Sequence, residues 1–165
     1  MSHFPLRLSL SLVLILAGSA SAASPVVIEE SGVAPIKIGM TLKEAKGAIK
    51  SLKPFGTDKD ECRVARVVQP KMDLLIENGK VTRIYVTDKT LSTAKGIHVG
   101  SSEADLKKAY GAALKIEPGK YDDKSHSIQL LGANGVGIGF ETDGKMVKEI
   151  SVGTAAALQY VEKCG

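Results

Sequence analysis

The chain contains no tryptophan, and only 4% of its 165 residues are aromatic. A core without large rings must be built mainly from Val, Ile, Leu and Ala side chains. Sugar-binding platforms usually rely on exposed aromatic rings, and this chain has few rings to offer. The shortage of aromatic residues therefore argues against a carbohydrate-binding module.

A strong excess of charge of either sign is also lacking. The chain has 22 basic and 18 acidic residues, which gives a formal net charge of +4 at pH 7. A mild excess of this kind supports solubility, whereas nucleic-acid binders carry a much denser basic surface. We therefore expect no nucleic-acid partner.

The sequence has no apolar run long enough to span a bilayer at its amino terminus. Residues 8–17 are largely apolar, follow Arg7, and precede small residues that end in Ala20-Ser21-Ala22. A spanning helix needs roughly 20 apolar residues, whereas this pattern is typical of a secretory signal peptide. The sequence predicts a signal peptide over residues 1–22, cleaved after Ala22, and a periplasmic or secreted protein without stable membrane insertion.

Removal of residues 1–22 leaves 143 of the 165 residues, the size of one ordinary domain. Arg7 leaves with the signal peptide, so 21 basic and 18 acidic residues remain, a net charge of +3. We expect a single α+β domain over residues 23–165.

Cysteine is scarce, with only Cys62 and Cys164 in the whole chain. In an oxidising compartment, one even pair most simply forms one disulfide. The alternative is two free thiols or a thiol nucleophile, but neither Cys has a neighbouring His or a Cys-x-x-Cys partner to activate it. The sequence favours the disulfide.

The first periodic segment is a short amphipathic helix over residues 41–52. Thr41 precedes Glu44 by three residues, the spacing of a capping box, and Pro54 is expected to stop the helix. Its apolar positions recur at helical spacing and comprise Leu42, Ala45, Ile49 and Leu52. Its lysine face comprises Lys43, Lys46, Lys50 and Lys53, which are solvated on the plain interpretation and would meet an anionic partner on the functional one.

The same plan returns 61 residues later as a helix over residues 102–110. Ser102 and Asp105 stand where Thr41 and Glu44 stand in the first helix. The apolar positions are Leu106, Ala109, Tyr110 and Ala113. The recurrence predicts an internal duplication, with half-repeats at about 33–90 and 91–165.

Each predicted helix is followed by a predicted hairpin. Residues 72–77 alternate in polarity and lead to Asn78-Gly79, the strongest short hairpin signal, and residues 136–140 lead in the same way to Asp143-Gly144. Strands joined by tight turns need no parallel crossovers. The predicted fold is therefore an antiparallel sheet with short helices on one face, α+β in class.

These motifs carry a resemblance. The helix starts, GMTLKEA and GSSEADLKKAYG, resemble the repeat of beta-lactamase-inhibitor-protein-like domains and that of the small lipoprotein of the outer-membrane assembly machinery. The whole mature chain is similar to a family of uncharacterised exported bacterial proteins. The positions that carry this second likeness are Cys62, Met72, 78–81, 93–97, Tyr110-Gly111, Tyr121 and 160–164. The resemblance implies a repeat-built binding or inhibitory module, and it implies neither a target nor catalytic residues.

Side chains suited to chemistry are few and poorly grouped. Asp122, Asp123 and His126 could ligate a divalent metal, but three polar residues on one loop more simply form a surface turn. His98 alternates with two apolar residues and is expected to face solvent. The acidic group Asp58, Asp60 and Glu61 is expected to be solvated beside Lys59 and Arg63. We assign no catalytic, cofactor-binding or metal-binding residue.

The glycines Gly135, Gly137 and Gly139 would share one face of a strand. A bare face allows close approach of a neighbouring element or of a ligand, and packing is the simpler of the two.

The sequence therefore predicts a binding or inhibitory module for another envelope or extracellular protein, and not an enzyme. Two alternatives stay open: an envelope hydrolase with an unrecognised site, and a structural accessory of the outer membrane.

Overall fold

The computed structural model describes residues 26–55 and 61–164. The predicted signal peptide over residues 1–22 and the acidic residues Asp58 and Asp60 lie outside the described residues. Within those residues, no helix is both long enough and apolar enough to cross a membrane.

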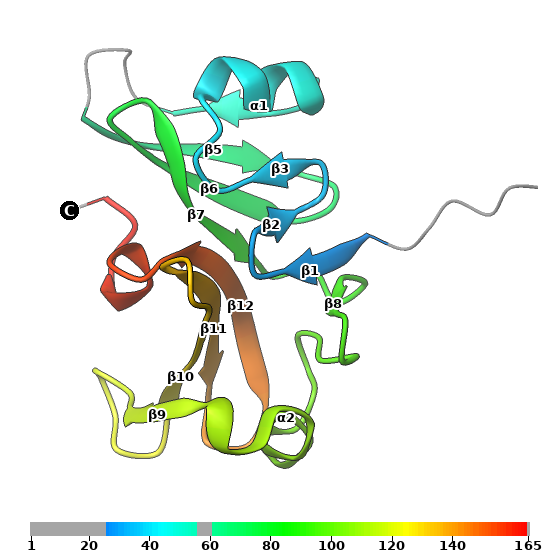
Figure 1. The fold of residues 1–165 in the computed structure, drawn as a ribbon, viewed down its shortest axis with the longest axis vertical. Helices are drawn as coiled ribbons and strands as arrows, with labels where there is room; N and C mark the ends of the chain where they lie inside the picture. Colours follow the sequence, from blue (N-terminus) through cyan, green and yellow to red (C-terminus); the bar gives the residue numbers. More distant parts are fainter. Residues whose placement is uncertain (1–25, 56–60, 165) are drawn as a thin grey trace, which may run out of the picture.

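Two sheets and two short helices form an α+β fold (Figure 1). The larger sheet is antiparallel throughout and has the order β4 (Lys53–Pro54), β5 (Cys62–Val67), β6 (Met72–Glu77), β7 (Lys80–Val86), β12 (Val147–Thr154), β11 (Val136–Thr142), β10 (His126–Leu131), β9 (Lys115–Pro118). The smaller sheet has the order β3 (Ile36–Lys37), β2 (Gly32–Val33), β1 (Val27–Glu29), β8 (Ser92–Thr93). The helices are α1 (Leu42–Ala48) and α2 (Glu103–Tyr110), and two 3-10 turns are η1 (Gly111–Ala113) and η2 (Ala157–Gln159).

The larger sheet joins the two halves of the chain at its centre. Strands β4 to β7 follow one another from one edge of the sheet to its centre, and strands β9 to β12 follow one another from the opposite edge to the centre. The last strands of the two halves, β7 and β12, are therefore neighbours. The central pair is antiparallel, with Ile84 opposite Val152 and Tyr85 opposite Ser151. The predicted antiparallel sheet is confirmed.

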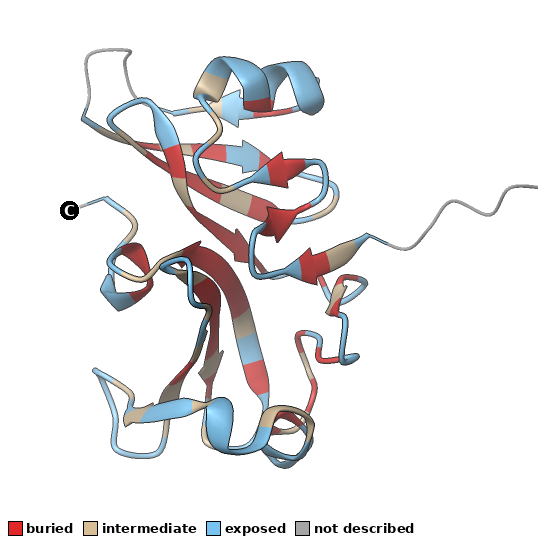
Figure 2. Cartoon of the chain, in the orientation of Figure 1, coloured by how far each residue is buried: buried red, intermediate tan, exposed pale blue. Residues whose placement is uncertain are grey.

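One face of the larger sheet carries the hydrophobic core. Figure 2 shows buried residues along the central strands β7 and β12. The helices and the smaller sheet cover this face and contribute Ala45, Leu106, Ile28, Val33 and Ile36, all at most 1% exposed. The core is aliphatic apart from Phe140, as the composition predicts.

Both helix starts have the caps that the sequence predicts. The Thr41 hydroxyl accepts the N–H of Glu44 at 3.2 Å, and the Glu44 carboxylate accepts the N–H of Thr41 at 2.8 Å, which completes the capping box. The Ser102 hydroxyl accepts the N–H of Asp105 at 3.0 Å. The apolar faces pack inward, partly buried at Leu42, Ile49, Ala109 and Tyr110, and the exposed residues are Lys43, Lys46, Lys50 and Lys107.

The first helix is shorter than predicted, because it ends at Ala48 and not at residue 52. Gly47 is the weakest helix former in its last turn, and the β-branched Ile49 leaves the helix with φ −125° and ψ 104°. Lys53 and Pro54 instead form edge strand β4, where proline is tolerated.

Each helix start is bonded to its own hairpin in the same way. The N–H of Gly39 donates to the carbonyl of Val81 at 2.8 Å, and that of Gly100 donates to the carbonyl of Val147 at 2.8 Å. The return bonds run from Val81 to Met40 at 2.7 Å and from Val147 to Ser101 at 2.9 Å. This common geometry supports the internal duplication, which stays a prediction.

The two hairpins differ in their turns. Asn78 and Gly79, with φ 50° and 77°, form the predicted two-residue turn between Glu77 and Lys80. The second connection has four residues, from Asp143 to Met146, with Gly144 at φ 82°.

Candidate functional site

The C-terminal residues 155–164, here called the tail, cross the face of the larger sheet that is opposite the core. In Figure 1 the tail (red) lies on one side of β7 and β12, and the smaller sheet lies on the other. We call this second face of the sheet the tail-covered face. Alternation along the strands places polar side chains on it, because the other side chains face the core.

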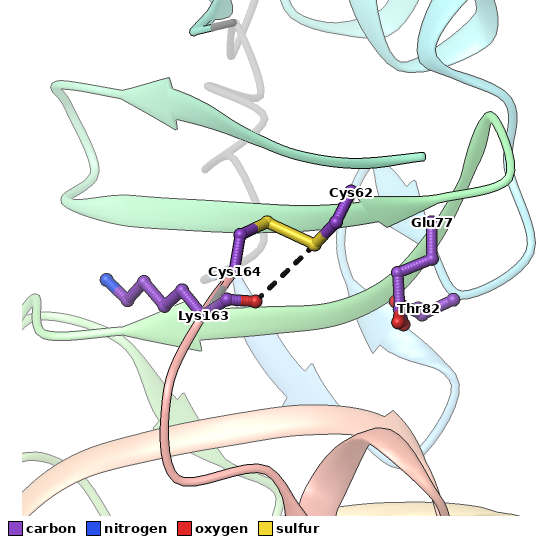
Figure 3. Close-up of a disulfide and its surroundings, with 5 residues drawn as sticks. All are labelled: Cys62, Glu77, Thr82, Lys163 and Cys164. Carbon is purple, nitrogen blue, oxygen red and sulfur yellow. Dashed lines mark hydrogen bonds between the residues drawn. A yellow bond between two sulfur atoms is a disulfide. The ribbon is translucent and has the colours of Figure 1, made fainter. Parts of the chain in front are cut away.

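The end of the tail is joined to β5 by a disulfide between Cys62 and Cys164, the pair expected from the sequence (Figure 3). The two Cα atoms are 5.9 Å apart and the residues are separated by 102 positions. The carbonyl oxygen of Lys163 lies 3.6 Å from the Cys62 sulfur. Because a bridged sulfur carries no proton, this is a packing contact, and it places the tail directly against β5.

The middle of the tail is held by one buried arginine. Arg83, on β7, is 2% exposed, and its guanidinium donates to the carbonyls of Ala157 and Tyr160, both at 2.9 Å. It also donates to the Ser151 hydroxyl at 3.0 Å. The guanidinium carbon Cζ of Arg83 lies 4.5 Å from the centroid of the Tyr85 ring, a cation–π distance. Arg83 therefore ties the tail to the two central strands.

Lys163 provides a third attachment. It forms an ion pair with Asp73 on β6, and Arg66 on β5 binds the same carboxylate with its Nε at 2.8 Å. Burial raises the pKa of Asp73, but the hydrogen bonds and charges of the two cations outweigh burial and lower it. Asp73 therefore stays ionised and holds the tail beside Tyr85, whose ring centroid is 4.8 Å from the Lys163 ammonium.

The glycine prediction is confirmed at Gly139 and wrong at Gly135. A Cβ on Gly139 would stand 2.8 Å from the Ser151 hydroxyl and 3.2 Å from the Leu158 side chain, so the tail packs onto bare backbone there. A Cβ on Gly137 would meet a carbonyl of the neighbouring strand at 2.3 Å. Gly135 precedes β11 and lies in a turn with φ 75°, because β11 begins only at the next residue.

Beside the tail, a cavity of about 420 Å³ opens on the second half of the tail-covered face. Its floor comes from β7 and from β10 to β12, one wall comes from the β9–β10 loop, and another comes from the tail. Across the floor, Ser127 pairs with Glu141 and Glu141 pairs with Glu149. The Ser127 hydroxyl donates to Glu141 at 3.0 Å. We call this cavity, with Glu141 and Glu149 on its floor, the candidate site.

A half-buried carboxyl and a buried phenol give the candidate site an unusual polarity. Burial raises the pKa of the Glu149 carboxyl, an effect that Lys163 and Arg83 oppose and Glu141 reinforces. Tyr85 is 5% exposed and lines the cavity. Arg83 lies near Tyr85, but its Nη1 donates to the tail carbonyls and its Nη2 donates to Ser151. Among the described residues, neither the Tyr85 hydroxyl nor the Arg83 Nε has a hydrogen-bond partner. Burial raises the pKa of Tyr85 too.

The rim of the cavity is aromatic and apolar. Tyr121 is 75% exposed, Tyr160 41% and Val161 44%, and all three line the opening. The Tyr121 hydroxyl donates to Glu162 at 3.2 Å, which links the β9–β10 loop to the tail. A second cavity of about 320 Å³ lies on the first half of the same face, beside Arg66 and Lys163, and Tyr85 borders both cavities.

The residues weighed for metal binding are not brought together. Asp122 lines the cavity and accepts the N–H groups of Lys124 and Ser125, both at 2.8 Å. His126 begins β10 on the core side, with its Nδ1 2.9 Å from the Glu103 carboxylate. Among the described residues there is no group of three His, Cys, Asp or Glu side chains that could hold a metal ion.

Two other sequence predictions have opposite outcomes. His98 is exposed between the buried residues Ile97 and Val99, so the alternation predicted there is confirmed. Glu61 is exposed as expected, but Arg63 is not a solvated loop residue. It lies on β5 and is only 9% exposed, because it falls in register with the core residues of that strand.

The sequence analysis singled out part of the wall and rim of the candidate site, namely Tyr121, Asp122 and residues 160–161, but none of the residues on its floor. A signal for Glu141 and Glu149 was available, because each alternates with core residues in a predicted hairpin and the two fall opposite each other. Tyr85 and Arg83 gave no such signal, since only the tail makes them buried.

Comparison with known proteins places the fold. No family model matches the chain, and a search of curated proteins finds no match. The structure is similar to that of the uncharacterized protein yfeY from Escherichia coli, at 16% identity and a TM-score of 0.54, over 79% of this chain and 99% of that one. It is also similar to an extracellular protein containing a SCP domain from Bacillus anthracis, at 8% identity and a TM-score of 0.52, over 88% of this chain and 51% of that one. At these identities the likeness is one of fold alone.

Proposed function

We propose that the chain is an exported binding or inhibitory module that docks another envelope or extracellular protein on its tail-covered face. The observation that carries this proposal is the exposed rim of Tyr121, Tyr160 and Val161 around a cavity of about 420 Å³. Tyrosine is enriched among the residues that dominate protein–protein binding energies, and such residues cluster around desolvated pockets. The proposal gives the chain a binding role and no catalytic one.

Export is part of this proposal. The Cys62–Cys164 disulfide would persist in an oxidising compartment and not in the cytosol. Mass spectrometry of protein recovered from periplasm or medium is expected to find a chain that begins at Ala23. An intact Met1 terminus in the membrane fraction would contradict export.

Affinity capture from an envelope extract, with matched variants as bait, tests the docking face. The wild-type chain is expected to retain a specific protein, and the double variant Tyr121→Ala, Tyr160→Ala is expected to lose it. Met146→Ala removes an apolar side chain of similar exposure, 37%, from the second hairpin and should retain the partner.

A second bait tests the lysine face of α1. Reversal to Glu of Lys43 and Lys46 on α1, and of Lys50 in the turn after it, should leave capture unchanged, because this segment covers the core face of the sheet. If the lysine-reversal variant loses the partner while the tyrosine double variant retains it, the docking site lies at α1 and not on the tail-covered face.

An envelope hydrolase is the second candidate, and one observation favours it. Glu141 and Glu149 are opposite each other in a cavity, and burial raises the pKa of Glu149 toward that of a general acid. A panel of chromogenic esters and glycosides distinguishes the two candidates. Turnover by the wild type that is lost in Glu149→Gln would favour the hydrolase over the binding module.

A further inference from the structure

The floor of the candidate site carries negative charge that the fold does not neutralise. Residues directly opposite on neighbouring antiparallel strands have Cβ atoms about 5 Å apart, and like charges in such pairs destabilise the sheet. Glu141 and Glu149 are such a pair. Among the described residues neither carboxylate has an ion pair within 4.0 Å, whereas Glu117 on the neighbouring β9 is paired with Lys115 at 3.0 Å.

Arg83 and Lys163 are committed elsewhere, and Lys120, an exposed residue of the cavity wall, forms no ion pair with either carboxylate within 4.0 Å. The guanidinium of Arg83 is used by two tail carbonyls and a serine hydroxyl, and the ammonium of Lys163 is bound by Asp73. Both cations act on Glu149 through space, yet burial outweighs them. The carboxylate pair therefore gains most from a cation that enters the cavity from outside.

The Tyr85 hydroxyl is a second, independent feature of the same floor. It is buried and unpartnered among the described residues, and an unpaired buried polar group costs free energy. A phenol oxygen can accept an N–H from a cation, but it is a weaker acceptor than a carboxylate. Tyr85 lines the same cavity, but its hydroxyl is covered, so Glu141 and Glu149 are the acceptors that the floor offers to an incoming cation.

The rim of the cavity indicates whether the cation belongs to a side chain or is a free ion. Lysine and arginine side chains have apolar stems that pack on aromatic surfaces while the charged end reaches further. Tyr121 and Tyr160 stand at the opening, where such a stem would pass. A small inorganic cation would make no use of this rim.

We propose that the cavity receives the side chain of an arginine or lysine from the docked partner, with the cation bound between Glu141 and Glu149. This assignment rests on the proposed function, since it names the group that enters the docking face.

Amide NMR of the mature protein tests the assignment with N-acetyl-arginine methylamide and N-acetyl-lysine methylamide as probes. The neutral N-acetyl-norleucine methylamide is the matched control ligand. The cationic probes are expected to shift the amides of Ser127, Glu141 and Glu149 saturably, with a Kd on the order of 1 mM for molecules of this size. N-acetyl-norleucine methylamide should leave the chemical shifts of these amides unchanged.

Three variants locate the charge. Glu149→Gln and Glu141→Gln should each weaken the cationic probes at least about tenfold, the effect of losing a charged hydrogen bond. Glu29→Gln, which removes an exposed carboxylate that does not line this cavity, should change the Kd by less than threefold. The amide spectrum of each variant reports whether it folds, and two separate carboxylate variants keep the test available if one does not.

Absence of saturable shifts, equal shifts with norleucine, or unchanged binding in both carboxylate variants would overturn the assignment. Failure of the docking proposal is distinguishable from this. If the cationic probes do not bind while capture still depends on Tyr121 and Tyr160, the docking face is supported and the proposed cation site is contradicted. If the probes bind as expected while the tyrosine double variant captures the same proteins as the wild type, the cation site is supported and the proposed docking face is contradicted.

Discussion

Arg83 donates a 2.9 Å hydrogen bond to the carbonyl of Tyr160, a residue 77 positions further along the chain. The same guanidinium holds the carbonyl of Ala157, so one buried side chain fixes the course of the tail over β7 and β12. The tail in turn forms one wall of the candidate site and covers Tyr85. The geometry of the site therefore depends on contacts between strand β7 and the C-terminal tail, two segments that are far apart in the sequence.

Arg83→Leu is expected to release the tail. Two carbonyls lose their charged donor, and each buried group left without a partner costs about 1–3 kcal/mol, so the loss should be about 2–6 kcal/mol. Urea unfolding measures it, and limited proteolysis should cut the variant between residues 155 and 164. Arg66→Leu is the matched control, because its side chain is 54% exposed, and it should cost less and leave the tail protected. Equal effects of the two substitutions would contradict the central role of Arg83.

The double variant Cys62→Ser, Cys164→Ser tests the contribution of the disulfide. A bridge that closes a loop of 102 residues restricts the unfolded chain. Its loss is expected to cost about 4–5 kcal/mol in the chain-entropy model. Chemical denaturation measures the difference. Dithiothreitol should lower the stability of the wild type by a similar amount and leave the variant unchanged, and a reductant effect on the variant would show a different cause.

Leu106 tests the packing of α2. Its side chain is fully buried, and truncation of a buried leucine usually costs 2–5 kcal/mol, so Leu106→Ala should fall in about that range. Lys108→Ala, exposed on the same helix, should change stability by less than about 0.5 kcal/mol. A difference near zero between the two variants would mean that α2 does not pack on the sheet.

Glu103 gives the fold a dependence on pH. Burial raises the pKa of this carboxyl, but hydrogen bonds from Lys107 at 2.6 Å, Thr142 at 2.6 Å and His126 at 2.9 Å outweigh burial and hold the pKa at about 2. The ordinary value is 4.5, so the folded state binds the proton less well than the unfolded chain. The resulting stabilisation is present above pH 4.5 and is lost as the pH falls toward 2.

Urea unfolding between pH 7 and pH 2.5 measures this contribution. The wild type should lose on the order of 3 kcal/mol through Glu103 over that range. Glu103→Gln should be less stable than the wild type at pH 7 and should show a flatter pH profile. Glu29→Gln, an exposed control, should keep the wild-type slope. Parallel profiles for the wild type and Glu103→Gln would remove Glu103 as the cause.

Local features of the fold could be predicted from the sequence because their causes are local. The cap at Thr41 requires only Glu44 three residues later, and the turn at Asn78 and Gly79 requires only residues that accept positive φ. The end of α1 was missed because Pro54 was taken as the stop. Gly47 and Ile49 end the helix earlier.

The candidate site depends on long-range pairing and could not be predicted in the same way. The direct pairing of β7 with β12 brings Tyr85 opposite Ser151, and no pattern within either strand requires that order. Alternation with Ile84 places Arg83 on the face opposite the core, where the tail crosses it and buries it. Alternation could have placed Glu141 and Glu149 on one face, but not inside a cavity.

Photo-crosslinking in the envelope tests the central claim most directly. The photoreactive residue benzoylphenylalanine replaces Tyr121 at the rim of the cavity or, as the control, Lys46 on the exposed side of α1. Irradiation of cells is expected to give one defined adduct from position 121 and none from position 46, and the adduct should weaken when Glu149→Gln is added. Adducts from position 46 with none from position 121 would contradict docking on the tail-covered face.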